Sequence, residues 1–122
     1  NAALNYFYSI ILSCFNRDIV SSGYLTQLGL FHGNMFNQFN LSCDLMEPFR
    51  PFVDNWVKNM SPKSFDKNEK QMLISLLNKD IIVDGRTNTM INAIKIYCKS
   101  IFSAIEENDI SLIKFPTMNY EL

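Results

Sequence analysis

The residues best suited to chemistry lie between Leu28 and Asp54. This stretch holds His32, the single histidine of the chain, followed by Asp44 twelve residues later and Glu47 fifteen residues later. Side chains three residues apart on a helix lie about 5–6 Å apart on one face, so Asp44 and Glu47 can share one site. A loop that returned His32 to that helix would add an imidazole. This mixed nitrogen and oxygen set suits Mn²⁺ or Mg²⁺ better than structural zinc, which usually recruits thiolates.

Each of these residues also has a purely structural explanation. A lone histidine in an aromatic-rich loop is more often a hydrogen-bonded packing residue than a metal ligand. Asp44 and Glu47 have the spacing of a capping box at the start of a helix. Glu47 and Arg50 can form a surface ion pair worth less than about 1 kcal/mol. The spacing alone therefore leaves both a metal site and a structural role open.

The elements that would position these residues are mostly helical. Apolar residues recur at steps of three and four, and the first such segment also carries a polar stripe that argues against a transmembrane span. In the second segment Pro51 should kink the helix, and the large rings of Phe49 and Trp56 should lie in the centre of the core. The predicted helices cover Ala2 to Val20 and about residues 44–60, 67–78 and 89–106.

Two further segments complete the predicted fold. Residues 24–43 show no sustained period but hold several large apolar side chains, which predicts a long ordered loop carrying His32. Ile81 to Val83 is a short apolar run before an Asp-Gly turn, which predicts a very short β element at a sheet edge. We therefore expect a mostly α fold, a single helical domain of about four to six helices.

Composition narrows the class of protein. The chain has 122 residues, of which 48% are hydrophobic and 19% charged, as in an ordinary globular domain. A net charge of −1 gives no overall basic signature for nucleic acid. Lys95 and Lys99, four apart, could form a local basic edge, but a solvated helix face is the more common explanation of such a pair. Three cysteines without a CxxC pair argue against a disulfide framework or a zinc knuckle, and favour a reducing cytoplasm.

Several stretches closely resemble a known family. NAALNY at residues 1–6, GLFH at residues 29–32 and DLMEPFRPFVD at residues 44–54 resemble the CRISPR-associated integrase, the Cas-one protein that inserts new spacers. The longer string NQFNLSCDLMEPFRP is most similar to the version found in type II systems. The resemblance extends to VDGRTNTMINAIKIY and so covers nearly the whole chain, with the central block as its most specific part.

The resemblance implies a divalent-metal site with a glutamate, a histidine and a second acidic residue as ligands. His32 and Glu47 match the last two, which makes them the expected catalytic and metal-binding residues for Mn²⁺ or Mg²⁺. Asp44 matches a neighbouring aspartate that supports the site, and Arg50 matches an arginine that would orient Glu47 or meet a phosphate. The first glutamate would precede this chain. The resemblance thus implies that residues 1–122 are the helical C-terminal catalytic domain, a fragment without the N-terminal β-domain and that glutamate.

The function implied is that of a metal-dependent DNA endonuclease and integrase of CRISPR adaptation, which inserts spacer DNA into the repeat array by transesterification. Its partners would be double-stranded DNA (spacer precursor and repeat), a second copy in a homodimer and the small Cas-two protein. Other type II adaptation proteins are further candidates, no membrane is expected, and the location would be the prokaryotic cytoplasm. We expect the fragment alone to be inactive. The alternative is a non-catalytic helical protein-interaction module.

Overall fold

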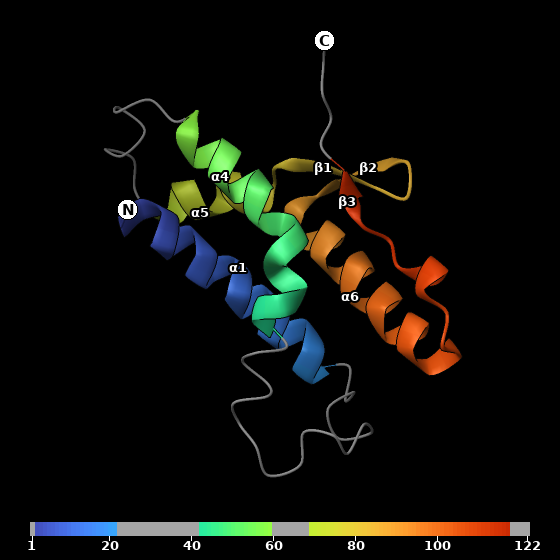
Figure 1. Ribbon diagram of the computed structural model, residues 1–122. Coiled ribbons are helices and arrows are strands. Elements are labelled where there is room, and N and C mark those ends of the chain that lie inside the picture. The colour runs from blue at the N-terminus through green and yellow to red at the C-terminus, as the bar shows by residue number, and fades with distance from the viewer. Residues whose placement is uncertain (1, 22–41, 60–68, 118–122) are drawn as a thin grey trace.

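The computed structural model describes residues 2–21, 42–59 and 69–117, so the predicted loop with His32 lies outside the described residues. Within them the fold is mostly helical with a small sheet, which confirms the predicted fold class (Figure 1). The helices are α1 (Ala2–Ser21), α4 (Arg50–Lys58), α5 (Glu69–Leu77) and α6 (Met90–Glu107). The short elements are the 3₁₀ turns η1 (Glu47–Phe49) and η3 (Ile110–Leu112) and the strands β1 (Asp80–Val83), β2 (Arg86–Thr89) and β3 (Pro116–Thr117).

Helix α1 buries one face and exposes the other, as its periodicity predicts. Its fully buried face includes Ile11, Phe15 and Ile19. On the exposed face the hydroxyls of Ser9 and Ser13 each donate a hydrogen bond of 2.9 Å to the backbone carbonyl four residues earlier. Such bonds satisfy a hydroxyl without any partner outside the helix. No helix within the described part of the chain is long and apolar enough to cross a membrane.

The segment after residue 41 is not the single kinked helix that the sequence predicts. Residues 42–46 are helical, η1 then interrupts the α-helix, and α4 begins at Arg50. A proline ring clashes with the backbone carbonyl four residues earlier, so a regular α-helix cannot run from Glu47 to Pro51 without interruption. The backbone N–H of Arg50 instead donates to the carbonyl of Glu47, three residues back. The interruption therefore falls before Pro51, in the turn that carries Glu47.

Aromatic rings join α1, η1 and α6 into one core. The centroid of the Phe49 ring lies 5.4 Å from that of Phe15 and 5.4 Å from that of Tyr97, both in edge-to-face geometry. Phe49 is fully buried, as predicted. Trp56 is not central: it is half-buried and packs against the core through Phe7, with centroids 4.7 Å apart. The prediction that Trp56 lies at the centre is therefore wrong, and the buried residues of α4 are Phe52 and Val53, one turn earlier.

The predicted β element is the middle of a three-stranded sheet. The strand order is β2-β1-β3 and both pairings are antiparallel. Asp84 and Gly85 form the turn between β1 and β2 with φ of 57° and 73°, a left-handed pair typical of a tight hairpin. β1 is thus not an edge strand, because β3 returns from the C-terminal part of the chain and pairs with Ile82 and Val83.

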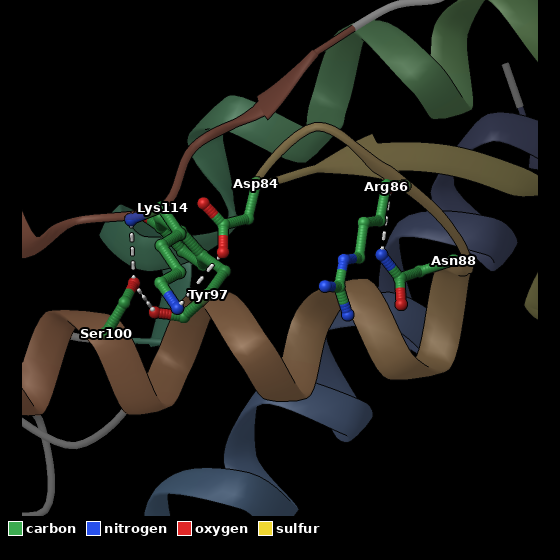
Figure 2. Close-up of polar contacts among 6 residues, drawn as sticks. All are labelled: Asp84, Arg86, Asn88, Tyr97, Ser100 and Lys114. Atoms are coloured by element: carbon green, nitrogen blue, oxygen red, sulfur yellow. Dashed lines mark hydrogen bonds and ion pairs between the residues drawn. The ribbon is translucent and has the colours of Figure 1, made fainter.

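The segment after α6 folds back along that helix to reach the sheet (Figure 1). Asn108 ends α6 in a left-handed conformation, with φ of 52°. The backbone N–H of Lys114 donates to the Ser100 hydroxyl at 2.9 Å, and the Lys114 ammonium lies 3.3 Å from Asp84, as Figure 2 shows. The ring of Phe115 lies 6.0 Å from that of Tyr97. These contacts position β3 beside β1.

Candidate functional site

The turn that carries the predicted acidic residues is anchored by its apolar neighbours. Leu45, Met46 and Phe49 are buried, whereas Asp44 and Glu47 are exposed. The Ser42 hydroxyl donates to the side-chain oxygen of Asn16, which ties the start of this segment to α1. Apolar and acidic residues alternate along this segment, so the apolar side chains pack into the core while the carboxylates face solvent. Both carboxylates can therefore reach a ligand from outside the domain.

Glu47 and Arg50 are brought together. Nε of Arg50 lies 3.2 Å from Oε1 of Glu47, while 60% of the Glu47 side chain and 38% of the Arg50 side chain remain exposed. An ion pair this exposed contributes less than about 1 kcal/mol to stability, so its main effect is to restrict where the Glu47 carboxylate points. The predicted surface ion pair is confirmed.

Arg50 is also in contact with α1. Its guanidinium carbon lies 5.2 Å from the centroid of the Tyr8 ring, which is a cation–π contact. The Tyr8 hydroxyl in turn donates a hydrogen bond to Oδ1 of Asp54 on α4. Glu47, Arg50, Tyr8 and Asp54 thus form a continuous polar chain between η1, α1 and α4.

The environment keeps the Tyr8 hydroxyl protonated. Burial, together with the hydrogen bond to Asp54 and the charge of that carboxylate, raises the pKa of Tyr8 to about 12. The charge of Arg50 acts in the opposite direction and that of Glu47 in the same direction, but both effects are smaller. At neutral pH the phenol is therefore a hydrogen-bond donor to Asp54, not a phenolate.

The structure resolves some of the sequence predictions about this site and leaves others untested. Residues 42 and 43 are already helical, so Asp44 does not cap the helix and the capping-box explanation is wrong. His32 lies outside the described residues. Within the described ranges, no group of three or more His, Cys, Asp or Glu side chains could hold a metal ion. Glu47 and Asp44 carry carboxylate oxygens, the ligand type that Mn²⁺ and Mg²⁺ prefer.

Tyr8 and Asp54 are site residues that motif spacing alone does not reveal. Tyr8 falls in the apolar stripe of the first helix, but a phenol in such a stripe needs a hydrogen-bond partner, and this was a usable signal. Asp54 follows Arg50 by four residues and so lies on the same face of α4. The pairing across the two helices could not be found from spacing, because 46 residues separate Tyr8 from Asp54.

The two lysines considered as a local basic edge lie on α6 beside a carboxylate of α1. Lys95 and Lys99 line a hollow of about 150 Å³ together with Asp18 from α1. Asp18 is buried, which raises its pKa, while the charges of Arg17, Lys95 and Lys99 lower it. Because a buried carboxylate lies within this hollow, the two lysines do not form a uniformly positive surface. The Glu47 segment is the better candidate for the functional site.

Comparison with known proteins assigns the chain to a family. Residues 1–88 match the family described as CRISPR associated protein Cas1. This match includes α1, the Glu47 turn and α4, and thus every residue of the candidate site. The chain belongs to the Cas1 family. The resemblance found in the sequence is confirmed at the level of the family, whereas the type II variant remains a prediction.

Two relatives show how much of a Cas1 protein the chain represents. It is 32% identical over 121 residues to the CRISPR-associated endonuclease Cas1 of Neisseria meningitidis serogroup C (strain 8013), an alignment that covers 95% of this chain and 40% of the relative. It is 29% identical over 133 aligned residues to the CRISPR-associated endonuclease Cas1 of Korarchaeum cryptofilum (strain OPF8), covering 98% of this chain and 38% of the relative. The chain therefore spans about two-fifths of the length of these relatives.

Proposed function

We propose that this chain is the helical catalytic part of a longer Cas1-family DNA endonuclease and integrase, which inserts spacer DNA into the repeat array by transesterification. Its main support is the exposed Glu47 carboxylate, oriented by Arg50 on a turn that the family match includes. Two relatives named as endonucleases support the nuclease part of the proposal. On this proposal a DNA 3′-hydroxyl attacks a phosphodiester of the repeat.

Each site residue has a defined role in this proposal. Glu47 and His32 would bind Mn²⁺ or Mg²⁺, and Asp44 would support them through its exposed carboxylate. The bound ion would stabilise the negative charge that develops on the phosphate. Arg50 would orient Glu47 and offer its remaining N–H groups to the DNA backbone. The described carboxylates are accessible oxygen donors, which fits a hard divalent cation.

We further propose that the 122-residue chain alone is inactive. Mn²⁺ and Mg²⁺ prefer six oxygen-rich ligands, and protein carboxylates largely set how tightly they bind. The resemblance places one metal-binding glutamate outside this chain, and within the described ranges no group of three or more His, Cys, Asp or Glu side chains could hold an ion. The ion would then bind weakly. A net charge of −1 also gives little counterion release on DNA binding.

The proposal extends to the assembly that the family resemblance implies. Its partners would be double-stranded DNA from the spacer precursor and the repeat, a second copy of the protein in a homodimer, and the small Cas-two protein. Other type II adaptation proteins are further candidates. We place this assembly in the prokaryotic cytoplasm, which the three free cysteines Cys14, Cys43 and Cys98 support.

The test uses the longer protein that contains these residues. His32→Ala and Glu47→Ala should each abolish Mn²⁺-dependent DNA cleavage and strand joining while leaving the melting temperature within a few degrees of the parent. Glu106→Ala is the matched control, since Glu106 is an exposed glutamate on α6, and it should leave cleavage unchanged. Electron paramagnetic resonance of Mn²⁺ should show weaker ion binding in both site variants. Cleavage that survives the loss of both His32 and Glu47 would contradict the proposal.

One observation favours the alternative of a non-catalytic interaction module. The returning segment after α6 exposes apolar side chains, with Ile110 85% and Phe115 55% exposed. Large apolar side chains left exposed along one segment are candidates for burial against another protein. The two functions are separable, because an interaction module would keep its partner after Glu47→Ala and lose it after Ile110→Ser or Phe115→Ser. The integrase would instead lose cleavage only in the Glu47 variant.

A further inference from the structure

We propose that Tyr8 is a positioning residue of the site. Held by Asp54, its ring fixes the plane of the Arg50 guanidinium beside Glu47, so that the free N–H groups of Arg50 meet a phosphate oxygen of the DNA. This inference rests on the proposed function, because it concerns how the same site meets its DNA. It assigns Arg50 the role of a phosphate contact whose geometry is set from another helix.

The first step is the unused hydrogen-bonding capacity of Arg50. A guanidinium carries five N–H donors in a rigid plane. Nε is near Glu47 at 3.2 Å but is buried and makes no hydrogen bond with any described residue. The structure likewise gives the other guanidinium nitrogens no partner within residues 2–21, 42–59 and 69–117. A charged, planar fork with free donors at a partly exposed position is suited to bidentate binding of a phosphate.

The second step is that Tyr8 fixes this fork. The Tyr8 ring lies under the guanidinium at 5.2 Å from its carbon, and the hydroxyl cannot swing away while it donates to Asp54. Arg50 and Asp54 belong to the same helix, α4, whereas Tyr8 comes from α1. The hydrogen bond to Asp54 therefore holds the hydroxyl end of the Tyr8 ring, and the face of that ring supports the Arg50 guanidinium. An arginine that is already ordered loses less conformational freedom when it binds a phosphate.

A purely structural role for Tyr8 predicts something different. If Tyr8 only packed α1 against α4, its removal would weaken folding, and any effect on DNA binding would be the same whether or not Arg50 was present. If Tyr8 acts through Arg50, its effect on DNA binding must disappear once Arg50 is removed. A double-mutant cycle separates the two, because coupled residues give non-additive effects.

The experiment measures binding of a fluorescent DNA duplex to the longer protein in EDTA, over a series of NaCl concentrations. Tyr8→Leu should weaken binding about two- to fivefold, the range expected for a cation–π contact at a partly exposed site. Arg50→Gln should weaken it further and reduce the slope of log K against log salt by about 1, as expected for one lost phosphate contact. Adding Tyr8→Leu to Arg50→Gln should then cause no further change in DNA affinity.

Two controls keep the result interpretable. Tyr6→Leu removes an exposed tyrosine two residues away on the same helix and should leave DNA binding unchanged. Tyr8→Phe retains the ring but loses the bond to Asp54, so it should have an intermediate effect even if Tyr8→Leu folds poorly. Equal losses from Tyr8→Leu in the parent and in Arg50→Gln would overturn the inference, as would no loss in the parent. Because no metal is present, these outcomes are independent of whether Glu47→Ala abolishes cleavage.

Discussion

Phe49 connects the candidate site to the core, and its truncation tests that connection. Its side chain is 0% exposed and lies in η1 between Glu47 and Arg50. Replacing a buried phenylalanine by alanine typically costs about 3–5 kcal/mol. The edge-to-face contacts with Phe15 and Tyr97, each worth about 0.5–1.5 kcal/mol beyond simple burial, place Phe49 in the upper part of this range. We therefore expect Phe49→Ala to lower the free energy of unfolding by about 4–5 kcal/mol.

Trp56→Ala is the informative comparison. Tryptophan has the larger ring, so an argument from size alone predicts the larger loss for Trp56. In the structure Trp56 is half-buried and its ring contact is with Phe7, at 4.7 Å. Its truncation should cost about 2 kcal/mol, within the usual range for substitutions outside the centre of a core. Phe49→Leu, which keeps most of the volume, should cost less than about 1.5 kcal/mol.

Urea unfolding followed by far-ultraviolet circular dichroism measures these differences. A domain of this size has a total stability on the order of 10 kcal/mol, so Phe49→Ala should remain folded but lose a large part of its stability, with a melting temperature lower by more than about 10 °C. The reasoning is refuted if Trp56→Ala costs as much as Phe49→Ala, or if Phe49→Ala costs less than about 1 kcal/mol. Either result would mean that the ring cluster around η1 is not the centre of the core.

Three further predictions concern single groups. Gly85→Ala should lower the free energy of unfolding by about 1 kcal/mol because φ there is 73°, although a Cβ would have no atom within 4 Å; an unchanged urea midpoint would contradict this. Burial raises the pKa of the Cys98 thiol to about 12. A thiol reagent at pH 8 should therefore label the less buried Cys43 first and Cys98 only on unfolding. Mass spectrometry of the labelled chain measures this order. Tyr8 and Tyr97 have pKa values of about 12 in the folded protein, above the value near 10 in the unfolded chain. Their contribution to stability should therefore be complete below pH 10 and lost between pH 10 and 12. A free energy of urea unfolding that stays constant from pH 9 to 12 would exclude this contribution.

The helical class of the protein and its family can both be predicted from local features of the sequence. The three- and four-residue periodicity of α1 and α6 is a local property, because a helix turns every 3.6 residues and the apolar side must face the core. The motif around Glu47 was equally readable, and so was the Glu47–Arg50 pair, since residues three apart on a helical turn are neighbours. His32 as a ligand remains a prediction from the sequence.

The contacts between residues far apart in the sequence could not be predicted in this way. Tyr8 and Asp54 are 46 residues apart, and Thr117 bonds to a carbonyl of β1 from 35 residues away. Periodicity shows that a side chain faces inward but does not say which element it meets there, because that depends on how whole helices and strands pack. For this reason β1 was expected at a sheet edge and Trp56 at the centre of the core, and both were wrong. For the same reason the support of Arg50 by Tyr8 could be found only once α1 and α4 were placed side by side.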